Sequence, residues 1–195
     1  MTTPTPVVNN LEPQAIVVDN FLANPDEIRQ FALEQEYKER HSAGLRSLTH
    51  FPFTEVYRPA FEQLLNVGVK PYGWDFEGTV NGCFQWCEAK TPKVIHCDNQ
   101  RWAGALYLTP DAPPESGTTL YRRKSSKARF SSEHTPPDDL FSGGFFDQTL
   151  WEPVDQIGNV YNRLVLWNGH TVHAASVYFG TKVDNSRLFQ VFFFE

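Results

Sequence analysis

The sequence predicts a mainly β protein with flanking helices, folded as a single domain over residues 1–195. Two observations lead to this fold class. From about residue 78 onward, apolar and polar residues alternate in short runs that are rich in Val, Phe, Tyr and Trp and separated by Gly, Pro, Asn and Asp; this pattern is typical of β-sandwiches and β-barrels. A length of 195 residues, with 41% hydrophobic and 21% charged residues, suits one globular domain.

The N-terminal part of the chain has a different pattern. Residues 1–14 are rich in Pro, Thr and Asn and predict a flexible tail, and the apolar run 15–21 predicts a short strand. Pro25 follows an Asn and precedes two acidic residues, which is typical of a helix start, and we expect this helix to run to about Lys38. A second helix is expected over 59–66.

The β-rich core is expected to span 78–195, after an N-terminal region of one strand and two helices at 15–77. A long polar stretch at 122–160 interrupts the core and is expected to be an insertion, either a functional lid or a mobile loop. The candidate strands of the core share the alternating pattern: 79–88, 93–97, 102–109, 117–122, 163–168, 172–179 and 186–194.

Charge, cysteine content and hydropathy argue against several classes of protein. The formal net charge of −6 and the pI near 5.5 argue against a nucleic-acid partner, because neutralising phosphates requires a basic face. Cys83, Cys87 and Cys97 form no CxxC pair, so we expect free thiols rather than disulfides or a thiolate zinc site. No run approaches the roughly 20 apolar residues of a membrane span, and no secretory signal is recognisable, so the expected location is cytoplasmic.

A candidate metal site begins with the segment VIHCD at 94–98. His96 and Asp98 are two residues apart on a predicted strand, so their side chains project from the same face. The segment LVLWNGHTVH combines an apolar strand, an Asn-Gly turn and a histidine, His173, that opens the next strand; His170 follows directly on the turn and is the alternative ligand. Two histidines and one carboxylate leave three positions open on octahedral Fe(II), as bidentate 2-oxoglutarate and O₂ require.

A buried cation is predicted on the last strand. The run SRLFQVFFF places Arg187 on the same face as Phe189, Val191 and Phe193. An arginine among inward-facing apolar residues is costly to bury unless it meets an anion. A carboxylate held bidentately by the guanidinium is the natural partner. Lys182, in the loop before this strand, is the alternative anion partner.

Five motifs together resemble the Fe(II)/2-oxoglutarate-dependent oxygenase superfamily, especially its prolyl-hydroxylase-like branch. They are HCD, ALYLT, SGTTLY, LVLWNGHTVH and SRLFQVFFF, and they cover roughly residues 80–195. The resemblance implies a double-stranded β-helix core of the jelly-roll, cupin-like type. It also implies Fe(II), 2-oxoglutarate and O₂ as cofactors, with His96, Asp98 and His173 as metal ligands and catalytic residues.

The resemblance further implies two residues that bind the cosubstrate. Arg187 matches the basic residue that binds the distal carboxylate of 2-oxoglutarate, and Tyr107, in ALYLT, matches a tyrosine whose hydroxyl also reaches it. The sequence departs from the family pattern in two places. Arg187 follows His173 by 14 positions (187 − 173), somewhat more than usual, and Ser116 and Gly117 stand where a Gly-Gly pair is common. A longer hairpin before Arg187 can absorb the first departure.

The implied function is that of a dioxygenase that oxidises, most often by hydroxylation, a small-molecule or peptide substrate and releases succinate and CO₂. The alternative is a non-catalytic, cupin-like β-barrel that binds a ligand. A zinc hydrolase or cupin-like isomerase could also use two histidines and an acid, but needs neither an inward arginine nor a nearby tyrosine. A basic cluster in the polar stretch is either a solvated loop or a lid that guides an acidic substrate: Arg122, Arg123, Lys124, Lys127 and Arg129.

Overall fold

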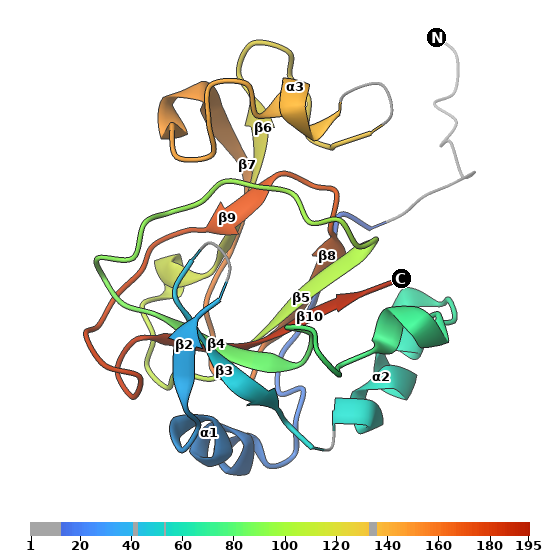
Figure 1. The fold of residues 1–195 in the computed structure, drawn as a ribbon, viewed down its shortest axis with the longest axis vertical. Coiled ribbons are helices and arrows are strands. Elements are labelled where there is room, and N and C mark those ends of the chain that lie inside the picture. Colours follow the sequence, from blue (N-terminus) through green and yellow to red (C-terminus); the bar gives the residue numbers. More distant parts are fainter. Residues whose placement is uncertain (1–12, 41–42, 53, 133–135) are drawn as a thin grey trace, which may run out of the picture.

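The structure is a computed structural model that describes residues 13–40, 43–52, 54–132 and 136–195. Most of the predicted tail at 1–14 lies outside the described residues. The described chain forms two antiparallel sheets (Figure 1), one with the strand order β1-β8-β5-β10-β4-β3-β2 and one with the order β7-β6-β9. The strands are β1 Ala15–Val18, β2 Tyr37–Glu39, β3 Leu45–His50, β4 Cys83–Cys87, β5 Trp102–Tyr107, β6 Thr118–Arg123, β7 Trp151–Ile157, β8 Leu164–Asn168, β9 His173–Ala175 and β10 Arg187–Phe194.

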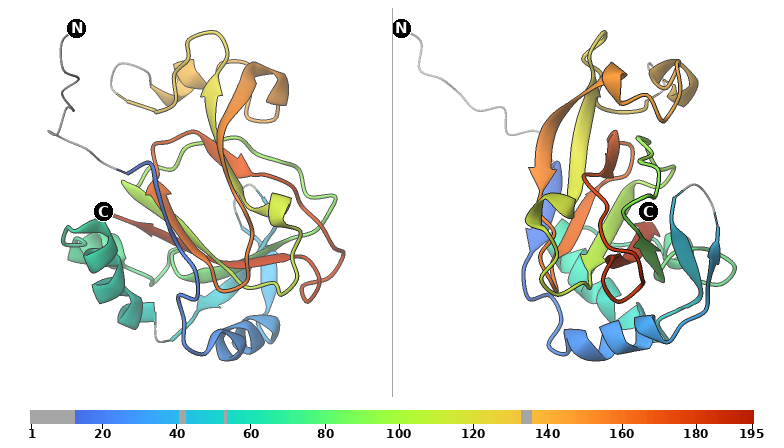
Figure 2. Two further views of the ribbon diagram at one scale, coloured as in Figure 1. Left: turned by 180° about the vertical axis from the view of Figure 1, so that it is seen from behind. Right: turned by 90° about the vertical axis from the view of Figure 1, so that its left-hand side faces the viewer.

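The helices are short and lie outside the sheets. They are α1 Pro25–Leu33, α2 Tyr57–Leu65 and α3 Pro137–Leu140, with 3₁₀ turns η1 Thr54–Val56, η2 Pro71–Trp74, η3 Pro114–Ser116 and η4 Gln148–Leu150. Figures 1 and 2 show α1 and α2 on the side of the larger sheet that faces away from β9. None of the helices in the described ranges has the length and apolar character needed to cross a lipid bilayer.

The larger sheet has two different faces, and β10 shows why. Along this central strand Leu188, Phe192 and Phe194 point toward the helices, where Phe61 of α2 packs against both aromatic rings at centroid distances of 5.1 and 5.4 Å. The intervening residues belong to a second core on the opposite face. Burying a large apolar side chain contributes about 1.5–3 kcal/mol, so the aromatic core anchors the sheet while the other face lines the site.

The predictions for the N-terminal region need correction. Helix α1 ends at Leu33, not near Lys38, because residues 37–39 form strand β2 and pair with β3. The Tyr37 hydroxyl donates to the carbonyl of Ala32 at 2.8 Å, and its ring packs edge-on against that of Trp86. These tertiary contacts override the helical tendency of the segment. Strand β3 itself was not predicted.

The polar stretch at 122–160 also differs from the prediction of an insertion without strands. Its last part forms β7, which pairs with β6 along the whole of that strand. Pro153 lies in β7, where the register shifts between Leu120 and Tyr121 of its partner strand. A proline in a strand is tolerated at such a bulge, and it made the strand hard to predict. Figure 2 shows β6 and β7 extending away from the larger sheet, with α3 near their far end.

Candidate active site

The structure brings His96, Asp98 and His173 together. One ligand atom from each residue lies within 4.8 Å of the other two. The Asp98 carboxylate lies 3.7 Å from His96 Nε2 and 3.3 Å from His173 Nε2, and the two imidazole rings are 4.4 Å apart. Two imidazole nitrogens and a carboxylate are suitable ligands for a divalent first-row metal.

The backbone holds these residues by a mechanism that differs from the prediction. Residues 93–97 do not form a regular strand; instead the backbone N–H groups of His96 and His173 each donate to the other's carbonyl, at 3.0 and 2.8 Å. The N–H of Asp98 donates to the carbonyl of Gly169 at 2.8 Å. A Cβ at Gly169 would lie 2.2 Å from the carbonyl oxygen of Gln100, so this close approach requires glycine. The expected same-face placement of the ligands therefore depends on pairing with the turn before β9.

Hydrogen bonds also orient both imidazoles. Nδ1 of His96 lies 3.1 Å from the carbonyl of Val94, and Nδ1 of His173 lies 2.8 Å from the carbonyl of Thr171. A carbonyl can only accept, so each Nδ1 carries the proton. Burial, with a further contribution from neighbouring His96, lowers the pKa of His173 to about 4, so this ring is neutral at pH 7. Its Nε2 then carries a free lone pair, the form that binds metal.

The contact between Asp98 and His173 indicates that a cation belongs here. Oδ2 of Asp98 is buried and has no hydrogen-bond partner among the described residues. It lies 3.3 Å from Nε2 of His173, so with a neutral ring two lone-pair atoms face each other. Such an unpaired buried oxygen is destabilising, whereas a bound cation would interact favourably with both atoms. The donor set therefore fits a metal ion.

His170 does not join this group. Its backbone N–H donates to the Asn168 side chain in the turn, and its carbonyl accepts from Ser131 and from the thiol of Cys97. The turn at 168–170 and the start of β9 at His173 match the prediction.

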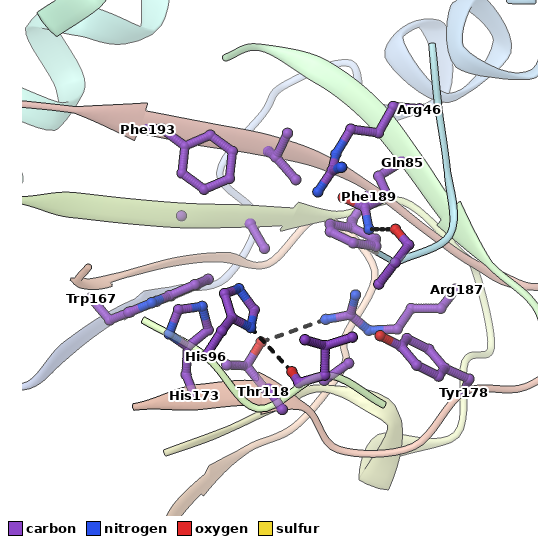
Figure 3. Close-up of a pocket in the computed structure, with 17 residues that line it drawn as sticks. Arg46, Gln85, His96, Thr118, Trp167, His173, Tyr178, Arg187, Phe189 and Phe193 are labelled. Carbon is purple, nitrogen blue, oxygen red and sulfur yellow. Dashed lines mark hydrogen bonds between the residues drawn. The ribbon is translucent and has the colours of Figure 1, made fainter. Parts of the chain in front are cut away.

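A cavity adjoins the candidate metal ligands between the two sheets (Figure 3). The inner cavity has a volume of about 80 Å³, and an outer cleft of about 630 Å³ lies next to it. Both spaces are lined by Arg46, His96 and Phe193, so they meet beside one of the metal ligands. The small side chains of Ala174 and Ala175 also line the inner cavity. A small molecule in the inner cavity and a larger one in the cleft could therefore both reach a metal ion held by these candidate ligands.

Arg187 is buried at the inner cavity, as the alternation of its strand predicts. Its side chain is 3% exposed, and the guanidinium lies 4.1 Å from the ring centroid of Phe189. Nε donates to the carbonyl of Ser116 at 2.8 Å and Nη2 donates to that of Gly117 at 3.2 Å. No carboxylate pairs with it among the described residues, so its positive charge is available to a bound anion. Lys182, the alternative, is exposed and does not line the cavity.

Tyr107 lies beside Arg187 but behind the cavity wall. Its ring centroid is 5.3 Å from the guanidinium, and its hydroxyl shares a hydrogen bond of 2.8 Å with that of Thr118. Thr118 lines the cavity and Tyr107 does not. Tyr178, which the sequence analysis did not single out, also lines the cavity, and Figure 3 shows it beside Arg187. It follows β9 in an irregular segment, where no periodicity marks it.

Arg46 is a second buried arginine that the sequence analysis missed. It belongs to β3 and is 9% exposed. Figure 3 shows its guanidinium and that of Arg187 pointing into the cavity from opposite sides of Phe189. Burial lowers the pKa of Arg46. The structure thus places two arginines at a cavity where the sequence predicted one.

The basic cluster of the polar stretch is largely paired with acids of β7. Arg122 and Lys127 both contact Glu152, at 2.7 and 2.6 Å, and Arg129 contacts Asp155 at 2.7 Å. None of the five basic residues lines the inner cavity or the outer cleft. The geometry favours a solvated hairpin over a lid that guides an acidic substrate. The three cysteines are free thiols, as predicted.

Comparison with known proteins identifies relatives of the fold. No family model and no curated protein sequence matches the chain. HygX from Streptomyces hygroscopicus, solved with nickel, 2-oxoglutarate and hygromycin B bound, is a structural match with TM-score 0.54 and 12% identity, covering 91% of this chain and 82% of HygX. A prolyl hydroxylase from Trichoplax adhaerens, in complex with a peptide fragment of the hypoxia inducible factor oxygen degradation domain, matches with TM-score 0.52 and 10% identity, covering 93% and 83%. The predicted double-stranded β-helix is thereby confirmed.

Proposed function

We propose that this protein is an Fe(II)- and 2-oxoglutarate-dependent dioxygenase. One observation carries the proposal: two histidines and a buried, unpartnered carboxylate oxygen meet beside a cavity that also contains a buried arginine without an acid partner among the described residues. The structural relatives support it, because HygX was solved with 2-oxoglutarate and the Trichoplax protein is a prolyl hydroxylase.

Nε2 of His96, Nε2 of His173 and the carboxylate of Asp98 would hold the iron. When bound, the iron supplies the redox chemistry that couples oxidative decarboxylation of 2-oxoglutarate by O₂ to oxidation of a substrate C–H bond, releasing succinate and CO₂. The carbonyls that accept from Nδ1 keep both rings in the metal-binding tautomer. The aromatic rings of Trp167 and Phe189 line the cavity and limit access of water.

Arg187 is the residue that we expect to bind the distal carboxylate of 2-oxoglutarate. The Nη1 group, which makes no hydrogen bond among the described residues, can donate to it. The bonds from Nε and Nη2 to backbone carbonyls fix the guanidinium plane, so little conformational entropy is lost on binding. Thr118 lies within 3.5 Å of Nη2. We propose that Tyr107 contributes through the hydroxyl of Thr118, which it orients.

The proposed function is tested by succinate formation. Protein reconstituted anaerobically with Fe(II) and then exposed to O₂ is expected to convert 2-oxoglutarate into succinate and CO₂ slowly even without a prime substrate, and protein loaded with Zn(II) should not, because zinc has no redox chemistry. Succinate is measured by mass spectrometry. If 2-oxoglutarate binds but is never consumed, the alternative of a non-catalytic ligand-binding barrel is correct. Hydrolase activity with zinc would instead favour the zinc enzyme.

Separate replacement of the two histidines tests the choice of the distal ligand. His173→Ala is expected to lose bound iron and all succinate formation, because Nε2 of His173 faces Asp98. His170→Ala is expected to retain iron and at least part of the decarboxylation, because the contacts of His170 are made by its backbone. Bound iron and succinate are measured side by side in both variants. An active His173→Ala protein with an inactive His170→Ala protein would show that the ligand is His170.

A further inference from the structure

Arg46 has the features of a ligand-binding residue, and the proposed binding of the metal and of 2-oxoglutarate does not involve it. Its side chain is 9% exposed, yet no described acidic residue forms an ion pair with it. Nη1 donates to the backbone carbonyl of Arg40, while Nε is buried and has no hydrogen-bond partner among the residues that the structure describes. A buried guanidinium in this state is destabilising unless an anion completes its hydrogen bonds.

The position of Arg46 relates it to the substrate rather than to the cosubstrate. Arg46 is paired in register with Gln85 of β4, and Gln85 with Phe189 of β10, so the three side chains form a row across the sheet. Arg187 is two residues from Phe189 on the same face, and Figure 3 shows the two guanidiniums on opposite sides of this ring. Arg187 lines only the inner cavity. Arg46 and His96 each line both the inner cavity and the outer cleft.

The other charged side chains of the outer cleft are acidic. Besides Arg46, its charged side chains are Asp75, Glu195 and the metal ligand Asp98, and they lie among the amides of Asn81 and other polar residues. A carboxylate bound by Arg46 would therefore be followed, going outward, by a surface that favours a positively charged group. A molecule with both charges a few atoms apart fits this arrangement.

We propose that Arg46 binds the carboxylate of the prime substrate, and that the prime substrate is a free amino acid whose ammonium group faces the acidic side chains of the outer cleft. This assignment rests on the proposed function for the metal and 2-oxoglutarate. Arg46 and His96 both line the inner cavity and the outer cleft, so a substrate held by its carboxylate at Arg46 would extend its carbon chain through the space that the metal borders. Arg46 is thus a specificity-determining residue.

The test measures binding and does not depend on turnover. The full chain, loaded with Ni(II) in place of iron and with 2-oxoglutarate, is titrated by calorimetry with each of the twenty common L-amino acids. At least one is expected to bind, and its C-terminal amide, which lacks the carboxylate, should bind at least about 30-fold more weakly, as for loss of one partner of a buried charge pair. The N-acetyl derivative, which keeps the carboxylate and loses the ammonium charge, should also bind more weakly than the free amino acid.

Arg46→Met is the informative variant because it keeps the length and apolar stem of the side chain. We expect it to bind the amino acid and the amide equally weakly, while its affinity for 2-oxoglutarate stays within about twofold of wild type. Arg58→Met is the matched control: Arg58 interacts with Glu62 and with the carbonyl of Val69, away from both cavities. It should retain the preference for the acid over the amide.

Several results would overturn the proposal. They are binding of none of the amino acids, equal binding of acid and amide or of the free and N-acetyl forms by the wild type, and loss of 2-oxoglutarate binding in Arg46→Met. The comparison of ligands on the wild-type protein remains valid even if the variant does not fold. Succinate formation by the iron-loaded protein without added substrate would show that the proposed function stands although this inference has failed.

Discussion

Replacing Asp98 with alanine is expected to lower iron affinity by at least about 100-fold and to leave the fold intact. Loss of a residue that merely orients a metal ligand already costs about 10–100-fold in affinity, and Asp98 supplies the charge of the donor set. The buried Oδ2 makes no hydrogen bond among the described residues, and it faces the lone pair of His173 Nε2 at 3.3 Å. Its removal should therefore cost little stability in the metal-free protein.

The measurement is iron stoichiometry after anaerobic reconstitution, with thermal unfolding of the metal-free protein recorded alongside. Asp155→Ala is a suitable control, because this carboxylate pairs with Arg129 on the hairpin of β6 and β7 and lines neither the inner cavity nor the outer cleft. His96→Ala should behave like Asp98→Ala. Unchanged iron content in both variants, or a large loss of stability without any effect on metal, would show that the group is a structural pair.

Replacing Arg187 with methionine is expected to weaken binding of 2-oxoglutarate at least about 30-fold, with little change in iron affinity. Truncating one partner of a buried, hydrogen-bonded charge pair costs about 2–5 kcal/mol, and each 1.4 kcal/mol is about tenfold in affinity. The guanidinium is 3% exposed, and its backbone bonds to Ser116 and Gly117 already fix its direction. The free energy of the lost contact should therefore appear as a loss of affinity for 2-oxoglutarate.

Titration of the metal-loaded variants with 2-oxoglutarate measures this effect, and retained iron shows that the fold is intact. Arg187→Lys keeps the charge and loses the planar donors, so its affinity should lie between those of wild type and Arg187→Met. Lys182→Met is the control, because Lys182 is exposed. If 2-oxoglutarate binds equally well to wild type and Arg187→Met, another cation holds its carboxylate, and Arg46 or Lys182 would then be the next candidate.

Features that depend on local backbone geometry could be predicted from the sequence. Side chains alternate between the two faces of a strand whatever surrounds it, so the inward position of Arg187 followed from its apolar neighbours on β10. The two-residue spacing of His96 and Asp98 and the Asn-Gly turn before His173 are also local features, and they predicted the candidate ligands and the turn. Most core strands were also predicted, with bounds differing by a few residues.

Features that depend on which distant segments pair could not be predicted in this way. The register between β3 and β4 shifts after Arg46, and this irregularity hides Arg46 from any test for alternation. Helix α1 ends before the predicted residue because the segment after it pairs with β3 and packs against Trp86. The proline-containing segment 151–157 resembles a loop in sequence, but it forms β7 because it pairs with β6. The sequence also did not show that Thr118 would lie between Tyr107 and the cavity, because this arrangement depends on how β5 and β6 pack together.

The sequence by itself determined the ligand types, their spacing and the face of β10 that carries Arg187, because backbone geometry and residue chemistry are local. Only the tertiary structure decided that His96 would be aligned by hydrogen bonds with His173 rather than by a regular strand, and that Arg46 would reach the junction of the inner cavity and the outer cleft. His96 and His173 are 77 positions apart (173 − 96), and Arg46 is 39 positions from Gln85, its partner on β4 (85 − 46). Long-range pairing of this kind leaves no periodic signal in the chain.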